Sequence, residues 1–308
     1  MKTGKFGKYK ASIFPPKFVL AGLACALGVL SPVGAWAQLS LTLIVETQKV
    51  DEFYDARGRR HRPDGFELWN PIIAPGAEYS IPIAGWMPRW EPSVAFGTLW
   101  AFWKVRVSQD DEWLDSDFRL VWVLYYGALR TRYVDVYAGY LMDTAPRPDV
   151  RRGEVPLTNL SDEFYWAVYG KLPLQLPKGT LTLRAGIDYV MSLKHREGPQ
   201  EVDPFDERIP WAGVAYRWSV GKHGAIELGL TLKRPTYGPT KVDGVETAPA
   251  GHQWTLFPTL VISYKNFSLT WWGAGYISEY FTHGFTLSGK NSFAARRLNP
   301  SFVFTYTL

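Results

Sequence analysis

In several segments of this 308-residue chain, apolar residues alternate with a mostly polar set that includes the charged side chains. Arg184 and Asp188 are one example, because the positions of the same parity around them are Thr182, Gly186, Val190 and Ser192, while the intervening residues are mostly apolar. Successive side chains of a β-strand point to opposite faces, so these two charges would share one face. Charges of this kind could line a path for polar solutes.

The alternation predicts a set of inward-facing charges with more basic than acidic members. The basic residues are Lys104, Arg106, Arg119, Lys171, Arg184, Lys194, Arg217 and Lys233, and the acidic residues are Asp135, Asp188 and Glu227. Around a narrow water-filled path, this excess of basic groups would favour anions. In a filled interior, the same residues would instead form a structural network in which oppositely charged side chains brace one another.

Few residues are spaced for catalysis or for metal binding. Ser192 and His195 are the only pair worth testing as nucleophile and base, but their odd offset would put them on opposite faces of a regular strand. The acidic cluster Asp203, Asp206 and Glu207 could bind a divalent ion, although a solvated acidic loop is the preferred interpretation. The chain has no phosphate-binding glycine loop, no zinc motif and a single cysteine, Cys25, so no cofactor is expected.

Residues 1–37 are predicted to be a signal peptide that is cleaved after Ala37. Five lysines precede an apolar run over 18–30, which is followed by a helix-breaking stretch that ends in Ala-x-Ala. An uncleaved N-terminal anchor is the alternative. The chain has 34 Lys and Arg against 29 Asp and Glu, and five of those lysines lie in the leader. The remaining residues, 38–308, are therefore nearly neutral and give no argument for nucleic-acid binding.

The elements that position these residues are long amphipathic strands. The clearest alternation runs over 180–194, and other alternating runs also exceed the five or six residues that are usual in soluble sheets. A tilted membrane-spanning strand needs about nine to eleven residues. Aromatic residues make up 16% of the chain, which suits aromatic girdles at two membrane interfaces.

Tight turns and longer polar connections alternate strictly after Arg130. This asymmetry is typical of barrels with short periplasmic turns and longer outer loops. The predicted strands are 38–49, 66–83, 92–107, 116–129, 132–143, 163–176, 180–194, 209–220, 225–234, 253–264, 267–279 and 292–308. Ten or fourteen strands stay open, because six prolines interrupt residues 50–92, which could hold one strand plus an inward-folded loop.

The last residues resemble the assembly signal of bacterial outer-membrane barrels. Phe302, Phe304, Tyr306 and Leu308 share one face of an amphipathic final segment, although the usual terminal residue is Phe or Trp. The resemblance covers about eight residues and implies assembly by the barrel-assembly machinery of a Gram-negative bacterium. It identifies no activity and no specific porin-like family.

The sequence as a whole predicts an all-β protein, a transmembrane antiparallel up-and-down β-barrel of about twelve strands in the bacterial outer membrane. The expected function is a porin-like channel for passive diffusion of small polar, anionic solutes. Alternatives are a lipid-modifying enzyme of the lipase or lipid A deacylase type, and a structural or adhesive barrel with a filled lumen. A soluble β-sandwich is the non-membrane alternative.

The expected partners are the lipid bilayer, lipopolysaccharide and a small-molecule solute. Two basic runs, 59–62 and Arg151-Arg152, fall in predicted outer loops and could contact lipopolysaccharide phosphates. Plain solvated loop charge explains these runs equally well.

Overall fold

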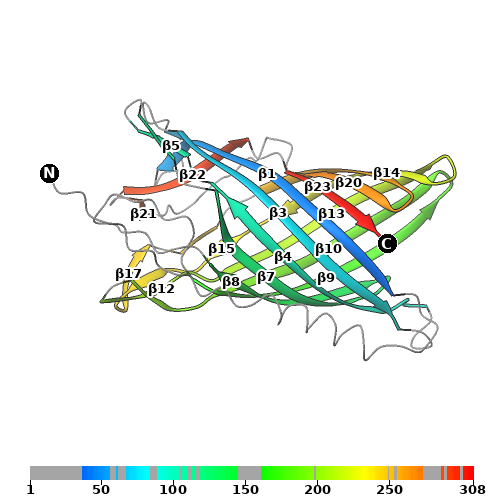
Figure 1. Cartoon of the computed structure of the whole chain (residues 1–308), viewed down its shortest axis with the longest axis horizontal. Coiled ribbons are helices and arrows are strands. Elements are labelled where there is room, and N and C mark those ends of the chain that lie inside the picture. The colour runs from blue at the N-terminus through cyan, green and yellow to red at the C-terminus, as the bar shows by residue number, and fades with distance from the viewer. Residues whose placement is uncertain are drawn as a thin grey trace, which may run out of the picture. The chain divides into compact units, whose positions relative to one another are not determined.

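The structure is a computed structural model, and it describes most of the chain after the predicted leader (Figure 1). The described residues are 37–55, 60–61, 67–83, 89–104, 106–109, 112–115, 118–144, 161–197, 199–248, 250–252, 255–272, 286–287, 290–298 and 301–308. Residues 1–36 of the predicted signal peptide and the basic residues Arg59, Arg62, Arg151 and Arg152 lie outside this set.

Twelve of the described strands pair side by side in chain order and close on themselves as an antiparallel barrel. They are β1 (Gln38–Asp55), β3 (Glu67–Pro82), β4 (Ser93–Trp103), β7 (Arg119–Arg130), β8 (Val134–Asp143), β9 (Glu163–Leu176), β10 (Gly179–Ser192), β13 (Glu207–Val220), β14 (Gly224–Lys233), β19 (Thr255–Tyr264), β20 (Phe267–Trp272) and β23 (Ser301–Thr307). The predicted up-and-down barrel and its twelve strands are confirmed, and most strand ends agree within three residues.

The barrel closes between its first and last strands. β1 pairs with β23 from Ser40↔Thr307 to Glu46↔Ser301, and the Ser40 and Thr307 hydroxyls are 3.1 Å apart. The Leu308 N–H also donates to the Leu39 carbonyl at 2.8 Å. Beyond β23, the same edge of β1 pairs with β22 (Lys290–Leu298). On the other edge, beyond β3, β1 pairs over two residues with β2 (Arg60–His61). Closure leaves neither terminal strand of the barrel with a free edge, as a bilayer requires.

The segment over 50–92 contributes one barrel strand in spite of its prolines. β3 keeps thirteen consecutive pairs with β1, including Pro71 and Pro75. On the other side of β3, Ala74 and Pro75 have no partners in β4, although the residues before and after them pair with β4 in the same register. Proline has no N–H to donate, so it interrupts one ladder locally without shifting the strand.

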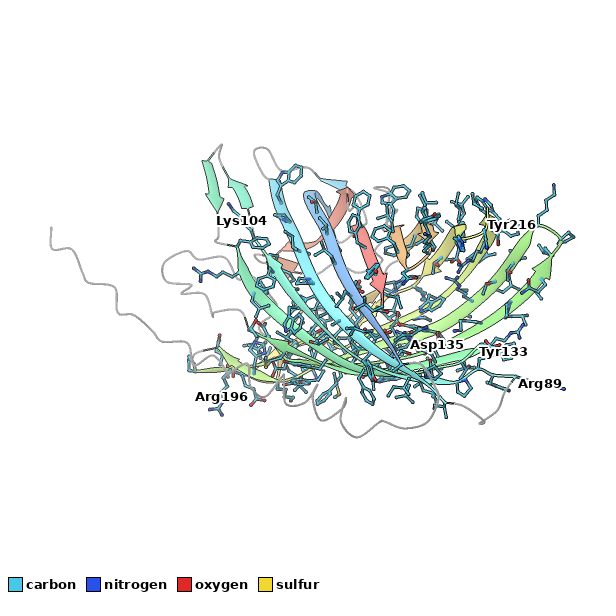
Figure 2. The ribbon with its side chains drawn as sticks, turned by 45° about the vertical axis from the view of Figure 1, so that its right-hand side comes forward. Arg89, Lys104, Tyr133, Asp135, Arg196 and Tyr216 are labelled. Carbon is cyan, nitrogen blue, oxygen red and sulfur yellow. The ribbon has the colours of Figure 1, made fainter. Side chains whose placement is uncertain are left out.

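The short connections gather at one end of the barrel, which we call the turn end. Four of them span 131–133, 177–178, 221–223 and 265–266, and Leu308 lies at the same end. Two turns use left-handed backbone, at Gly221 and Lys265. Figure 2 shows Arg89, Tyr133 and Tyr216 at this end, with Lys104 and Arg196 at the opposite end, which we call the loop end. The predicted alternation of short and long connections is confirmed.

Two of the predicted polar loops form a small sheet of their own at the loop end. β11 (His195–Glu197) pairs with β12 (Gln200–Asp203), β16 (Thr240–Val242) pairs with β17 (Val245–Ala248), and β12 joins β16. The Glu201 N–H donates to Asp243 and the Asp243 N–H donates back to the Glu201 carbonyl, each at 2.8 Å. These four strands form the loop sheet. Nearby, the short strands β15 (Thr236–Tyr237) and β18 (Gly251–His252) extend the barrel wall.

Three further short strands complete the description. β5 (Arg106–Gln109) and β6 (Glu112–Asp115) form a hairpin that pairs with the loop-end part of β3, and β21 (Thr286–Leu287) pairs with the start of β22. Within the described residues, no helix is long and apolar enough to cross a bilayer.

The outer face of the barrel carries the large apolar side chains. Leu172, Leu183, Leu228 and Phe96 are all exposed, with Phe96 at 56% and Leu228 at 52% of full exposure. Aromatic side chains mark both ends of this face, with Tyr216, Trp218, Tyr264 and Phe267 at the turn end and Phe118, Phe164, Trp166 and Tyr189 at the loop end. Side chains of the opposite parity face the interior, where most are polar or small and several are aromatic.

Candidate functional site on the inner wall

Eight of the eleven predicted charged residues have inward strand parity: Arg119, Asp135, Lys171, Arg184, Asp188, Arg217, Glu227 and Lys233. Lys194 lies beyond the end of β10 and pairs with Asp203 of the loop sheet, and Lys104 follows the last residue of β4. Asp135, Lys171 and Asp188 are connected by hydrogen bonds to other inward groups, and Arg184 bonds Glu227. Arg217 is directly opposite Glu227 in the β13–β14 pairing, and Lys233 is opposite inward Trp211. Arg119 is opposite Trp103 near the loop end. For Arg106 only the backbone is described.

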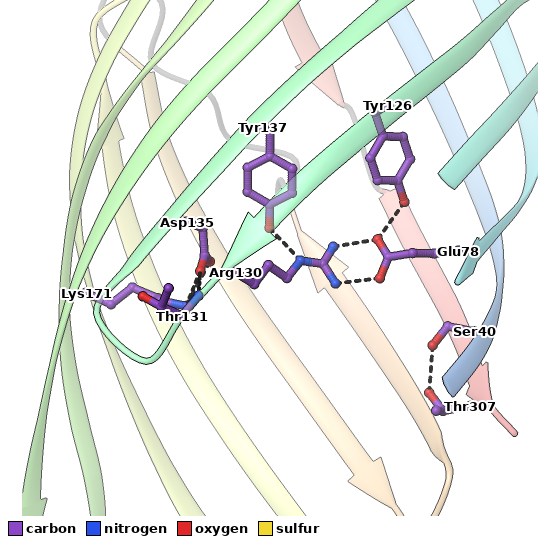
Figure 3. Close-up of polar contacts among 9 residues, drawn as sticks. All are labelled: Ser40, Glu78, Tyr126, Arg130, Thr131, Asp135, Tyr137, Lys171 and Thr307. Carbon is purple, nitrogen blue, oxygen red and sulfur yellow. Dashed lines mark hydrogen bonds and ion pairs between the residues drawn. The ribbon is translucent and has the colours of Figure 1, made fainter. Parts of the chain in front are cut away.

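A four-residue network at the turn end centres on Arg130 (Figure 3). Its guanidinium donates to both oxygens of Glu78 at 2.5 Å, and Tyr126 donates to the same carboxylate at 2.8 Å. The Arg130 Nε–H also donates to the Tyr137 hydroxyl at 3.1 Å. Tyr126 reaches Glu78 across Gly97, where an added Cβ would lie 2.3 Å from its ring. Charge-assisted bonds of this two-pronged kind are among the stronger ones in proteins.

Two more ion pairs continue around the wall. The Lys171 ammonium donates to both oxygens of Asp135 at 2.7 and 2.8 Å, and Asp135 also accepts from the Thr131 N–H in the adjacent turn. Arg184 bonds Glu227 at 2.6 Å across the intervening strand β13. The six residues Glu78, Arg130, Asp135, Lys171, Arg184 and Glu227 form the ion-pair belt. All lie within six residues of the turn-end limit of their strands.

Asp188 is one of the buried polar residues, and two tyrosines hold it. Tyr169 donates to its Oδ1 at 2.6 Å and Tyr165 approaches the same oxygen at 3.2 Å, while the two hydroxyls are 2.6 Å apart. Burying an ionised carboxylate is costly unless it is hydrogen-bonded, and these hydroxyls supply the bonds. Arg184, on the same face of β10 as Asp188, bonds Glu227 of β14.

An aromatic stripe crosses the inner wall beside the belt. The Tyr169 ring lies 5.1 Å from both Tyr137 and Trp211, measured between ring centroids. Between Tyr169 and Trp211 lies Gly186, where an added Cβ would come within 3 Å of both rings. The stripe ends at Lys233, whose Nζ is 4.8 Å from the centre of the Phe257 ring. The absence of a side chain at Gly186 is what lets the two rings meet.

Across the barrel from the belt, the described side chains on the inner face carry no charge in the half that is nearer the turn end. β19, β20, β23 and β1 put hydroxyl side chains in register on the inner face. They are Thr259, Ser263, Ser268, Thr270, Thr305, Thr307, Thr42 and Ser40. We call this set the hydroxyl wall. The interior is therefore two-sided, with the ion-pair belt and aromatic stripe on one side and the hydroxyl wall on the other.

The inner wall is closer to electrical neutrality than the alternation predicted. Strand parity adds the acids Glu46, Glu78, Glu163 and Glu207 and the base Arg130 to the inner face. Sequence reasoning missed Glu78 because it lies among prolines, and missed Arg130 because it was assigned to a turn. Glu163 and Glu207 were missed because they stand at or just before the predicted strand ends.

In most of strand β7, the side chains that face the interior are those predicted to face the lipid. The sequence put Phe118, Leu120, Trp122, Leu124 and Tyr126 together on the lipid face, but a β-bulge interrupts the register between β4 and β7 next to Val121. A bulge adds one residue and so exchanges the faces beyond it. Phe118 stays outside and stacks on Phe102, whereas Trp122 packs against inward Trp103 and Tyr126 bonds Glu78.

The pairs considered for catalysis and metal binding are separated. Ser192 ends β10 with its hydroxyl 3.5 Å from Glu163, while His195 begins the loop sheet opposite Val202. Asp203 pairs with Lys194 at 3.1 Å, Asp206 accepts from Tyr189 at 2.9 Å, and Glu207 lies inside the barrel. Among the described residues, no three potential ligands converge on a common metal position.

Comparison with known proteins shows which solved structures resemble this barrel. No protein-family model and no curated protein matches the sequence. Among solved structures, the chain is similar to the COG4313 outer membrane channel from Pseudomonas putida F1, with a TM-score of 0.66, 12% identity, and coverage of 91% of this chain and 97% of that one. The chain has the fold of a bacterial outer-membrane β-barrel. At this identity, the likeness concerns the outer-membrane barrel fold alone.

Two autotransporter barrels are more distant matches to the same fold. The β domain of the Bordetella autotransporter BrkA has a TM-score of 0.37 and 10% identity, with 89% of this chain and 100% of that one covered. The transport unit of AIDA-I from Escherichia coli has a TM-score of 0.34 and 11% identity, with coverage of 94% and 96%. Both scores are too low to support any comparison of outer-membrane barrel detail.

Proposed function

We propose that the protein is a passive channel of the bacterial outer membrane for small polar solutes, exported by a signal peptide cleaved after Ala37. The observation that carries this proposal is the inner wall itself. Apolar side chains cover the outside of a closed barrel, and charged, hydroxyl and phenolic groups line the inside. Eight strands enclose only enough space for side chains and sixteen leave a wide aqueous channel, so twelve suit a narrow path.

The pore-lining groups in this proposal are Arg119, Asp135, Lys171, Arg184, Asp188, Arg217, Glu227 and Lys233, together with Glu78 and Arg130. Each of the two ion pairs Glu78–Arg130 and Asp135–Lys171 has a net charge of zero, because each joins one acid and one base. The group Arg184, Arg217 and Glu227 keeps one positive charge in excess. This local excess supports an anion preference that is weaker than unpaired basic rings would give.

Single-channel recording tests the channel. The protein, purified from membranes after export, would be inserted in a planar bilayer under a salt gradient. Steady small openings whose reversal potential favours anions would support the proposal. A heat-modifiable, inserted barrel that never conducts would overturn it.

A barrel with a filled lumen is the second candidate, and the ion-pair belt is the observation that favours it. The belt and the aromatic stripe connect side chains from seven strands on the inner wall (β3, β7, β8, β9, β10, β13 and β14), as a structural network would. The substitution Trp211→Ala distinguishes the two candidates. It should raise the conductance of an open channel measurably, whereas a lumen filled by many other side chains would stay silent.

A lipid-modifying activity is not favoured, because Ser192 contacts Glu163 and His195 belongs to another sheet. Lipid hydrolysis by the purified barrel that disappears in Ser192→Ala would reverse this judgement.

A further inference from the structure

The hydroxyl wall is a continuous band of polar, uncharged groups across four neighbouring strands. Thr305 lies directly opposite Thr42 of β1 on one side and Ser268 of β20 on the other, and Ser268 lies opposite Ser263 of β19. All four residues are partly exposed, and their inward parity turns the exposed part towards the barrel interior. Each hydroxyl can donate one hydrogen bond and accept others, so the wall can bind water or a hydroxylated solute.

Arg217 presents a guanidinium group to the same interior, near the turn end of β13. The residue is exposed although its strand parity is inward. Glu227, directly opposite, is bonded by Arg184 at 2.6 Å, and Arg217 has no hydrogen bond or ion pair within the described part of the chain. A planar guanidinium can bind a carboxylate through two parallel hydrogen bonds. Arg217 is therefore available to a carboxylate that passes along the wall.

Only strand β14 separates Arg217 from the hydroxyl wall. In β14, Glu227 is opposite Arg217, and Ala225 is opposite Ser263 of the wall. Ala225 carries only a methyl group and is 8% exposed, so it does not project between them. Neighbouring strands are about 4.8 Å apart, so β13 and β19 are about 10 Å apart. A six-carbon solute can therefore contact Arg217 and the nearest hydroxyls of the wall together.

We propose that the channel prefers hydroxylated carboxylates, sugar acids of the uronate type, to anions of the same size without hydroxyl groups. The carboxylate would bind Arg217, while the hydroxyls of the solute replace water at the hydroxyl wall. An anion without hydroxyls would leave donors and acceptors of the wall unpaired, which is costly in a narrow path. The inference rests on the channel proposed above and names its substrate class.

Reversal potentials in planar bilayers test this preference with two anions of equal ring size. Glucuronate and cyclohexanecarboxylate each carry one carboxylate on a six-membered ring, but only glucuronate has hydroxyl groups. Potassium chloride is placed on one side of the bilayer and the potassium salt of either acid on the other. Relative to chloride, we expect glucuronate to be about threefold more permeant than cyclohexanecarboxylate, because only glucuronate satisfies the wall.

A double variant of the wall tests the role of its hydroxyls. Thr42→Val/Thr305→Val removes two hydroxyls that face each other in register and nearly keeps the side-chain volume. It should lower the permeability ratio of glucuronate to cyclohexanecarboxylate towards one. The matched control is Thr47→Val/Thr98→Val, in which both residues have the parity of exposed apolar side chains in their strands. The control should keep the ratio of the unchanged protein.

A charge-conserving variant tests the contact between Arg217 and the carboxylate. Arg217→Lys keeps the positive charge but loses the planar fork, so we expect the permeability of glucuronate relative to chloride to fall about twofold. The control is Arg132→Gln, which removes an exposed charge from the turn 131–133 at the same end of the barrel. It should leave that permeability unchanged. Heat-modifiable migration of every variant shows that the barrel still folds.

Three outcomes would overturn the proposed preference. Equal permeability of the two acids in the unchanged protein would mean that the channel does not recognise hydroxyl groups. An unchanged ratio in Thr42→Val/Thr305→Val would mean that the hydroxyl wall does not contact the solute. An unchanged glucuronate permeability in Arg217→Lys would mean that the guanidinium does not bind the carboxylate. In each of these cases chloride still conducts, whereas an inserted barrel that conducts no chloride would overturn the channel and this preference together.

Discussion

At the scale of single residues, the inner wall is organised by pairing more than by net charge. Arg184 bonds Glu227, and Arg217 lies directly opposite Glu227 in the register of β13 and β14, so this group contains two guanidinium groups and one carboxylate. Removing a charge from this group changes the local field near the turn end, where the belt lies. The direction of the change depends on which sign is removed.

Neutralising Arg217 should therefore lower the anion preference of the proposed channel. We expect Arg217→Gln to reduce the anion-to-cation permeability ratio about twofold, because the remaining Arg184–Glu227 pair is neutral. Glu227→Gln should change the ratio in the opposite direction. Reversal potentials under a salt gradient measure both, and identical values in the two variants would place this group outside the conduction path.

The Glu78–Arg130 pair should stabilise the barrel. Glu78→Gln keeps the side-chain size but weakens two short bonds to a partly buried guanidinium, so we expect a loss of about 2 kcal/mol in the free energy of unfolding. The control is Lys194→Gln, which breaks a pair in which the lysine side chain is 61% exposed. It should cost under about 1 kcal/mol. Urea unfolding in lipid vesicles compares the two variants.

At the scale of elements, strand existence and parity could be predicted from the sequence, whereas features that depend on two strands could not. The period of two identified β8, β9, β10, β13 and β14 with their correct faces. The bulge beside Val121 could not be predicted, because an extra residue is visible only against the neighbouring strand. Partner choice was missed for the same reason, since the bond from Arg184 to Glu227 depends on the register of three strands.

The loops show the same limit of prediction. Residues 195–207 and 235–251 read as polar connections, and nothing in either segment alone specifies pairing with the other. Their hairpins meet only because β10–β13 and β14–β19 bring them to neighbouring positions on the barrel rim. Of the candidate site, the sequence supplied most of the charged residues, but the acid Glu78 and the aromatic stripe required the fold.

Gly186, which lies between the Tyr169 and Trp211 rings, gives a prediction for β10. Gly186→Ala puts a Cβ 2.6 Å from the Val168 carbonyl and within 3 Å of the Tyr169 and Trp211 rings, so the strands must shift. Overpacking of this kind costs about 1–3 kcal/mol. Gly170→Ala is the control in the adjacent strand, where the nearest atom would be 3.6 Å away. Equal stability of the two variants in urea would contradict the steric explanation.

At the scale of the whole molecule, the barrel depends on the pairing of its first and last strands. Removing residues 301–308 leaves both β1 and β20 with unpaired edges, which a bilayer penalises by several kcal/mol for each exposed backbone group. We expect this truncated chain to give no heat-modifiable band on a gel. Deleting Leu308 alone removes one hydrogen bond to Leu39 and should leave the band in place.

The seam between Ser40 and Thr307 also makes the strand order of the barrel cyclic. Residues 39 and 308 are joined by a backbone hydrogen bond, so a short linker between them would turn the seam into an ordinary hairpin. A circularly permuted chain opened at the turn 177–178 would then keep every strand pair while moving its ends to the opposite wall. The strand order of the closed barrel therefore has no unique first strand. The positions of the chain ends do not determine which strands are neighbours.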